Sequence, residues 1–357
     1  MSDIVLIDPA AHAAPSRNRL FSGAMLAVTI FPILAVPLFG GTSNGTISDL
    51  DLLWLIFFFA RGHVALTVLF YFDRAFRTLA TSQPGRFIVA PLMIVGALPF
   101  LLMANETLFK ASVFLVFAWN IWHFHKQNMG VLSLICISNG QRPPDRYARL
   151  LAGLACAAGI ASFVPRQFAS IYGDGAFLFD AAALDTLLFA ALLGLIVLSA
   201  FASLARWGTQ NGAAQIFYFA SVSVYSIVFL LPGEIVYFAM AQATAHGLQY
   251  AIMVYAMGPA SGLAHPRPPE PRKTARLIYA CLVWTVLLLW SLFILKGDHA
   301  ARLLDDLLGT SAVLSWVQAF AVAALLAHFI VDGGAFKLRE QGPREWMQSR
   351  IGRLLSH

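Results

Sequence analysis

Apolar residues recur along this chain in long runs that short polar or charged stretches separate. A helix that crosses a bilayer needs roughly 17–25 mostly apolar residues. About ten runs approach that length, and they begin near Phe21, Leu50, Phe87, Leu108, Leu150, Ala181, Ala213, Ile235, Ala275 and Ala312. The pattern predicts an all-α fold, a polytopic integral membrane bundle of about ten spans, with about eight as the lower limit.

The composition agrees with a membrane protein and excludes an ordinary soluble domain. Of the 357 residues, 59% are hydrophobic and only 12% are charged, and the mean hydropathy is +0.72. Such values lie far outside the range of soluble globular proteins. The three cysteines, Cys136, Cys156 and Cys281, are widely spaced within or beside apolar runs, so we interpret them as small buried side chains and expect no disulfide framework.

The positive charges fall unevenly between the two sides of the predicted bundle. With a cytoplasmic N-terminus, 18 of the 24 lysines and arginines lie on the cytoplasmic side. This bias predicts that both termini are cytoplasmic, and it suits a bacterial inner membrane. The net charge of +6 is therefore interpreted as contact with anionic membrane lipid, with no nucleic acid as a partner.

The domain organisation predicted from the sequence is a single membrane domain, residues 1–357. A proline-rich basic segment, H-P-R-P-P-E-P-R-K, interrupts it at residues 265–273. Prolines at this density exclude a helix and favour a stiff linker. We therefore expect a core bundle at 20–258, a cytoplasmic linker at 259–275, a terminal helix pair at 276–335 and a basic C-terminal tail at 336–357.

Histidines stand inside the apolar runs, where an ionisable residue is costly and usually marks a functional site. They fall on the second, fourth, eighth and tenth predicted spans, which all run from the outer to the cytoplasmic face. Each lies in the middle or the inner half of its span, so one layer of the membrane can hold them all. The five are His63, His123, His125, His246 and His328.

Polar neighbours accompany these histidines at helical spacing. Residues three, four or seven apart share a helix face, and His328 and Asp332 stand at i and i+4. His123 and His125 point about 200° apart on a regular helix. Three alternatives follow: the helix is irregular there, as at a π-bulge; the two histidines serve different ions; or one is only a neighbour. The residues expected to orient the ligands by hydrogen bonds, without binding the ion themselves, are Asn120, Gln127, Gln249 and Asp73.

Several convergent imidazoles and a carboxylate suit iron, zinc or copper better than magnesium or calcium. We therefore predict a metal site formed by His63, His123, His125, His246, His328 and Asp332. It would hold non-haem iron, with one ion or more than one. Arg61 is a candidate counter-ion for an acidic substrate, and the sequence identifies no catalytic residue beyond the ligands.

Three classes of function remain open at this point. The first is an iron-dependent oxidoreductase, foremost an O2-dependent oxygenase, which acts on a lipophilic substrate from the bilayer and draws on an electron donor where the reaction requires one. The second is a haem-binding electron-transfer protein with paired axial histidines. The third is a proton-coupled transporter, in which buried histidines and acids relay protons.

Two short motifs resemble a known family. H-F-I-V-D at residues 328–332 and W-H-F-H at residues 122–125 are similar to motifs of the bacterial carotene dioxygenases of the Brp/Blh type. The resemblance implies a multi-span membrane fold with histidine-bound Fe(II). The chain departs from that family in having no H-x-x-x-H, so the resemblance bears on the type of site and not on the substrate.

Overall fold

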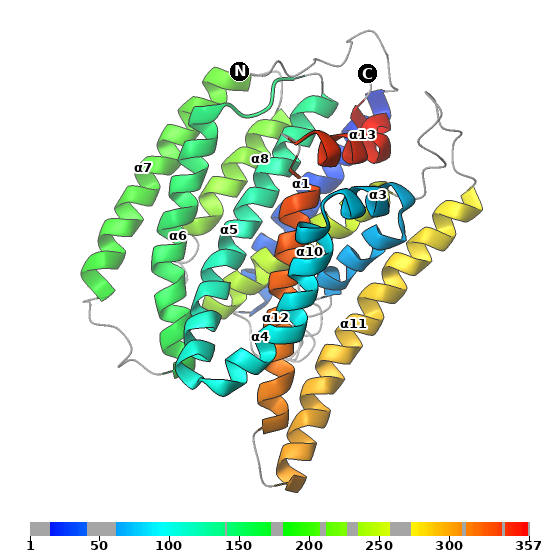
Figure 1. Cartoon of the computed structure of the whole chain (residues 1–357). Coiled ribbons are helices and arrows are strands. Elements are labelled where there is room, and N and C mark those ends of the chain that lie inside the picture. The colour runs from blue at the N-terminus through cyan, green and yellow to red at the C-terminus, as the bar shows by residue number, and fades with distance from the viewer. Residues whose placement is uncertain are drawn as a thin grey trace. The chain divides into compact units, whose positions relative to one another are not determined.

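The structure is a computed structural model of the whole chain, and it describes residues 15–40, 62–139, 141–172, 181–207, 212–226, 235–257, 273–308, 312–337 and 340–355. These residues form helices and no strand, as the sequence predicts (Figure 1). The predicted linker at 259–275 lies outside the described residues up to position 272. Arg61 lies outside them as well.

Contacts divide the chain into two compact units. The first comprises Met1–Leu52, Phe117–His246 and Gly352–His357, and the second comprises Leu53–Val116 and Gly247–Ile351. The structure therefore groups residues 53–116 with the last helices of the chain, whereas the sequence had placed them in a core bundle at 20–258. Two long helices, α5 and α10, each begin in one unit and end in the other.

The first unit is built from helices that run beside one another along much of their length. α6 packs on α7, α7 packs on α8, and α8 contacts α1 (Figure 1). A hydrogen bond from Asn139 Nδ2 to Ser22 Oγ, 3.1 Å long, ties the end of α5 to α1. The helices are α1 (Pro15–Gly40), the later part of α5 (Glu106–Ser138), α6 (Arg146–Tyr172), α7 (Ala181–Trp207), α8 (Gly212–Ser223), the short 3-10 helix η4 (Val224–Ser226) and the first half of α10 (Ile235–Ala256).

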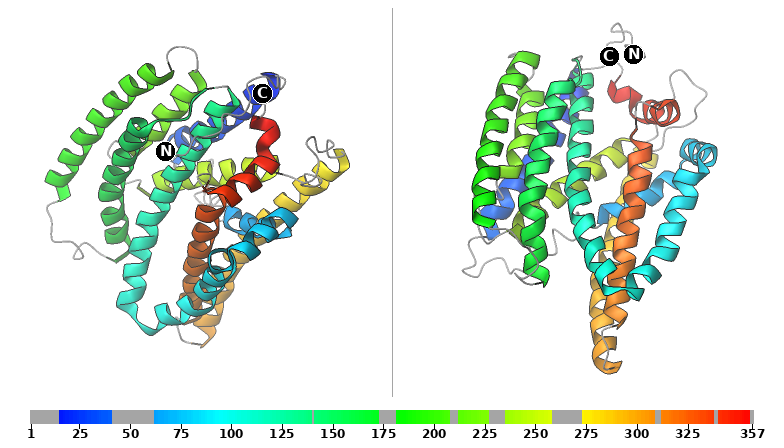
Figure 2. Two further views of the ribbon diagram at one scale, coloured as in Figure 1. Left: turned by 45° about the horizontal axis from the view of Figure 1, so that its top comes forward. Right: turned by 60° about the vertical axis from the view of Figure 1, so that its left-hand side comes forward.

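The second unit centres on α12, which packs along α4 and against α11 (Figure 2). Its elements are the 3-10 helix η1 (Thr67–Phe72), α3 (Arg74–Ser82), the π-helix η2 (Gly85–Val89), α4 (Ala90–Ala104), the end of α10, α11 (Lys273–Leu308), α12 (Ala312–Ala335) and α13 (Gln341–Leu355). Gly334 permits the closest approach, since a Cβ there would lie 2.7 Å from atoms of Arg86 and Phe87. α12 is therefore seated directly on η2.

Local sequence accounts for several helix starts. The Asp73 side chain accepts from Ala75 N at 3.0 Å and begins α3. Asn105 caps α5 in the same way, and Asp145 caps α6 through Ala148 N at 2.9 Å. Short polar side chains are preferred at this position because they satisfy backbone N–H groups that the first turn leaves open.

Three helices are long and apolar enough to cross a membrane: Gly85–Ala104, Thr186–Trp207 and Ser315–Ala335. In the first two, only 17% of the most apolar window is buried within the protein, whereas the window in Ser315–Ala335 is 44% buried. Large apolar side chains such as Phe201 and Leu198 are exposed along α7, which is expected of a surface that faces lipid. The chain thus has the character of a helical membrane protein, and the further spans stay predictions.

The predicted basic tail at residues 336–357 contains a helix, α13 (Gln341–Leu355). Its start has Pro343 in the first turn, where a missing N–H costs nothing. Trp346 and Met347 are buried, so this segment packs as a helix because it has an apolar face to bury.

Candidate metal site

A buried polar group lies in the second unit, where η1, α10 and α12 meet. It consists of His63, Thr67, Tyr250, His328 and Asp332, each at most 5% exposed. His63 precedes η1 by one turn, Tyr250 belongs to α10, and the last two stand on α12. The apolar sequence around these residues buries them, and hydrogen bonding then becomes obligatory for their polar atoms.

Hydrogen bonds connect four of the five side chains in a row. His328 Nδ1 lies 2.5 Å from Thr67 Oγ1, which lies 2.9 Å from the Tyr250 hydroxyl. That hydroxyl donates to Asp332 Oδ1 at 2.7 Å. If Asp332 is a carboxylate, the Tyr250 hydroxyl uses its single proton to donate to it. Thr67 must then donate to the Tyr250 oxygen, and His328 Nδ1–H must donate to Thr67 Oγ1.

With Asp332 ionised, this ordering places the proton of a neutral His328 on Nδ1. Because Nδ1 carries the proton, Nε2 of the neutral ring carries the lone pair. Nε2 lies 3.5 Å from Asp332 Oδ2. Two donors that each lie about 2.1 Å from one ion are about 3.0 Å apart at an octahedral angle and about 3.4 Å apart at a tetrahedral one, so this spacing is close to that of two donors sharing an ion.

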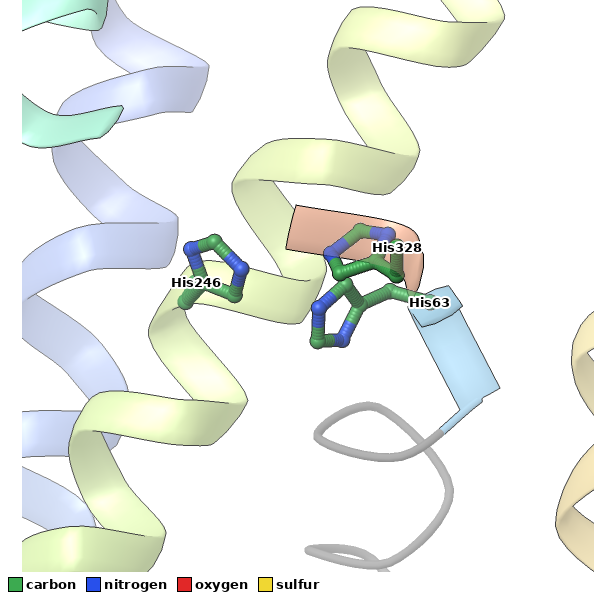
Figure 3. A group of neighbouring side chains, drawn as sticks. All are labelled: His63, His246 and His328. Atoms are coloured by element: carbon green, nitrogen blue, oxygen red, sulfur yellow. The ribbon is translucent and has the colours of Figure 1, made fainter. Parts of the chain in front are cut away.

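His63 supplies a second imidazole beside His328. The two rings are 5.0 Å apart between centroids and stand at 75° (Figure 3). A nitrogen of each ring lies within 4.8 Å of a nitrogen of the other. These two histidines, far apart in sequence, therefore lie side by side, and Asp332 lies beside His328.

An aromatic wall closes the group on the side of α13. The Tyr250 ring lies 5.5 Å from the rings of both His63 and His328. Phe70 packs on Tyr250 at 6.1 Å and on Trp346 of α13 at 5.1 Å. The Phe70 ring therefore packs against both Tyr250 and Trp346 of α13.

The first unit holds the other predicted histidines. His123 on α5 and His246 on α10 have ring centroids 4.9 Å apart, and Phe124 packs on His246 at 4.5 Å. A small hollow beside His246 is lined in part by Thr29, Asn128, Ser221 and Gln242. Figure 3 also draws His246, the last residue of the first unit.

His125 faces a different direction from His123. Its ring packs on Trp122 at 5.2 Å, and a Cβ on Gly153 of α6 would lie 3.9 Å from its Nε2. α5 is a continuous α-helix through residues 120–130. This contradicts the π-bulge alternative, because all of these residues are α-helical.

The residues predicted to support the site have varied surroundings. Gln127 Nε2 donates to the backbone carbonyl of His246 at 3.1 Å, so this bond holds α5 to α10. Asn120 is half-buried on α5, and Gln249 is buried on α10 beside Tyr250.

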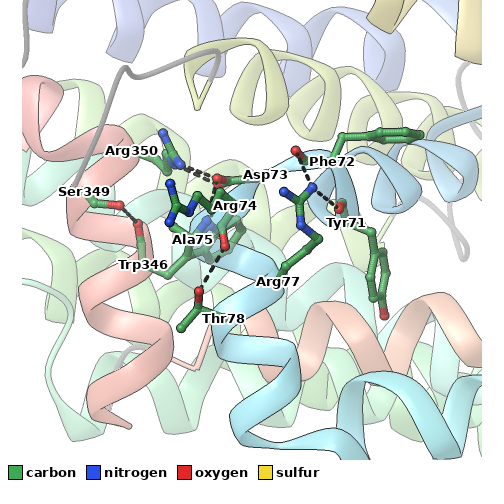
Figure 4. Close-up of polar contacts among 10 residues, drawn as sticks. All are labelled: Tyr71, Phe72, Asp73, Arg74, Ala75, Arg77, Thr78, Trp346, Ser349 and Arg350. Carbon is green, nitrogen blue, oxygen red and sulfur yellow. Dashed lines mark hydrogen bonds and ion pairs between the residues drawn. The ribbon is translucent and has the colours of Figure 1, made fainter.

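Asp73 serves another purpose from the one predicted. Arg350 Nε and Trp346 Nε1 donate to its Oδ2 at 2.7 and 2.8 Å, while Oδ1 binds Arg350 and caps α3 (Figure 4). Its carboxylate is thus committed to holding α13 against α3.

Two members of the group, Thr67 and Tyr250, were not predicted as site residues. Thr67 shares a helix face with His63, and Tyr250 stands four residues after His246. That spacing was the available signal, because i and i+4 share a face. Hydroxyls inside helices usually bond locally, however, so only the fold shows that these two join His328 to Asp332.

Comparisons with known proteins add no assignment. No protein-family model, curated protein or solved structure matches this chain. The similarity to the Brp/Blh type of dioxygenase therefore stays a prediction, and the function has to be argued from the site.

Proposed function

We propose that this protein is a membrane-embedded, non-haem iron oxidoreductase, foremost an O2-dependent oxygenase, acting on a lipophilic substrate. The observation that carries the proposal is that buried His328 has a ligand atom within 4.8 Å of one of His63 and its Nε2 3.5 Å from Asp332 Oδ2, all three residues lying in one unit. Two imidazoles and one carboxylate with open positions are the donor set of many non-haem Fe(II) oxygenases. Magnesium and calcium prefer all-oxygen sites, so they fit these donors poorly.

The hydrogen bonds around the donors support a metal site. Ligating histidines usually donate their second N–H to a neighbouring acceptor, which fixes the ring and its tautomer. The row from His328 through Thr67 and Tyr250 to Asp332 has this form, because it orients both the imidazole and the carboxylate. Tyr250 and Thr67 would therefore position the ligands rather than take part in the chemistry.

The location supports a lipophilic substrate. His328 and Asp332 stand on the candidate membrane span Ser315–Ala335, and the apolar rings of Phe70 and Phe329 pack on Tyr250 and His328. Iron held there would supply redox chemistry with O2. The protein's own contribution would be to hold the donors and to exclude water, which protects reactive species from side reactions.

The remaining predictions belong with this proposal. They comprise ligation by His123 and His246, a second ion, an electron donor, about ten spans, cytoplasmic termini and a bacterial inner membrane. The proposed ligands leave out His125, whose ring packs on Trp122. Haem is the alternative cofactor, and proton-coupled transport is the alternative function. Packing of the Tyr250 ring against both His63 and His328 disfavours a porphyrin between these two imidazoles.

The test is metal analysis of the purified full-length protein, reconstituted with Fe(II) without oxygen, together with its visible spectrum. We expect stoichiometric iron and no intense Soret band, and we expect the double variant His63→Ala/His328→Ala to lose the iron. Full iron content in a folded double variant would refute the site. A Soret band in the native protein would replace the proposal with the haem alternative, and a protein that binds no metal would favour transport.

A further inference from the structure

A short proline-containing loop in the first unit is held by side-chain hydrogen bonds to three successive backbone carbonyls. The loop, residues 141–145, joins α5 to α6 and reads Q-R-P-P-D. Trp207 Nε1 donates to the Arg142 carbonyl at 3.3 Å, Arg206 Nη2 to the Pro143 carbonyl at 3.0 Å, and Arg149 Nε to the Pro144 carbonyl at 3.0 Å. Prolines restrict the backbone further, so the loop is held in one shape.

This loop and the end of α7 border a hollow of about 270 Å³, lined by Gln141, Arg142, Arg206 and Trp207. That volume is near the lower end of the range for ligand pockets. Two guanidinium groups and an indole N–H give the lining donors and positive charge. Arg142 is exposed and Arg206 is partly buried, with 26% of its side chain exposed.

The Arg206 guanidinium is only partly engaged by the protein. Nη2 binds the Pro143 carbonyl, and Nη1 lies 4.0 Å from Asp145 Oδ2. Nε is buried and has no hydrogen-bond partner in the part of the chain that the structure describes. A guanidinium carries five N–H donors in a planar fork that matches the oxygens of a phosphate.

The hollow lies at the end of a membrane-spanning candidate. Arg206 and Trp207 are the last two residues of Thr186–Trp207. One turn earlier, Phe201 and Leu204 are 68% and 55% exposed, as expected of side chains that contact lipid tails. Tryptophan is enriched at the level of lipid headgroups, and arginine is favoured near anionic leaflets.

We propose that Arg142 and Arg206 form a binding site for the phosphate group of an anionic phospholipid headgroup. The apolar face of α7 would contact the lipid tails, and the fastened loop would present both guanidinium groups to the phosphate. This site is independent of the metal site, because it belongs to the first unit and shares no residue with the donors.

The test measures phospholipid binding by the delipidated, detergent-solubilised full-length protein. We expect phosphatidylglycerol to bind more tightly than phosphatidylcholine. Arg142→Gln should weaken phosphatidylglycerol about five-fold, since an arginine near an anionic lipid surface contributes about that factor. Arg142→Gln/Arg206→Gln should weaken it about 25-fold. Arg142 is exposed, so its single variant tests the site even if loss of Arg206 disturbs the fold.

Arg146→Gln is the matched control, because Arg146 is exposed on the next turn of the chain and does not line the hollow. Its affinity should change less than two-fold. An equal loss in this control would mean a diffuse charge effect and would overturn the site. Unchanged binding in Arg142→Gln would also overturn it. Binding of inorganic phosphate alone, without preference between the two lipids, would overturn the headgroup as its source.

Discussion

His328 and His125 are equally buried, each with 3% of its surface exposed, yet they lie in different kinds of surroundings. His328 has Thr67, Asp332 and a second imidazole as neighbours. The ring of His125 packs on Trp122 beside a glycine of α6. The difference teaches that burial of a histidine does not by itself indicate a site, and that the donors gathered around it do.

The sharpest way to break this comparison is to remove each histidine in turn. His328→Ala should lower iron affinity by more than the roughly 10–100-fold that loss of an outer-shell partner costs. His125→Ala should leave the iron content unchanged. Elemental analysis after Fe(II) reconstitution measures both. If His125→Ala lost iron as fully as His328→Ala, the distinction between the two surroundings would fail.

Two tyrosine variants distinguish a hydroxyl that supports the metal site from one that contributes only to the stability of the fold. Tyr250→Phe removes the donor to Asp332, so it should lower iron affinity about 10–100-fold and destabilise the apo-protein by about 1–3 kcal/mol. In the first unit, Tyr218→Phe removes a buried hydroxyl that donates to the Ala148 carbonyl at 2.9 Å. It should reduce stability without changing iron affinity, as thermal unfolding and metal titration would show. Equal metal affinities in the two variants would remove Tyr250 from the site.

Variants of two glycines, Gly334 in the second unit and Gly153 in the first, test how closely the helices pack around each position. Gly334→Ala would place Cβ 2.7 Å from Arg86 Cδ and from Phe87 Cε1. Overpacking of this kind costs about 1–3 kcal/mol. Gly153→Ala would meet His125 Nε2 at an ordinary 3.9 Å, so its unfolding midpoint should stay close to that of the native protein. The opposite order of midpoints would show that α12 is less closely seated than the structure indicates.

The smallest effect concerns Glu340, which lies between α12 and α13 and forms ion pairs with Arg86 of η2 and with Lys337. The neighbouring Arg86 and Lys337 lower the pKa of Glu340 from 4.5 to about 2. Because the folded pKa is depressed, the stabilisation is complete above pH 4.5 and disappears as the pH falls through about 2. Glu340→Gln should therefore lower the unfolding midpoint slightly at pH 6 and no longer do so near pH 2. A difference that persisted unchanged at low pH would contradict the role of this charge.

Much of the fold follows from local sequence, and the site follows only in part. Apolar runs predicted helices, and α7, α10 and α12 begin where the pattern placed them, at Ala181, Ile235 and Ala312. The spacing of His328 and Asp332 predicted one helix face, and their side chains are 3.5 Å apart. The helical angle between His123 and His125 was also right, since the two rings contact different neighbours.

Contacts between distant segments were beyond such patterns. Thr67 meets His328 across 261 positions and Tyr250 across 183. Asp73, expected beside the histidines, is bound by Arg350 from 277 positions away. Periodicity reports which residues share a face of one helix, but the packing of side chains between helices decides which faces meet.

By itself the sequence determined a helical chain of membrane character, with ionisable side chains set into its apolar runs. Its composition and period fix those properties residue by residue, because burial in lipid requires apolar helices. Only the tertiary structure decided that His63 and His328 come together, that Thr67 and Tyr250 connect His328 to Asp332, and that residues 341–355 form a packed helix. Those outcomes depend on the close packing of several helices at once, which no single stretch of sequence contains.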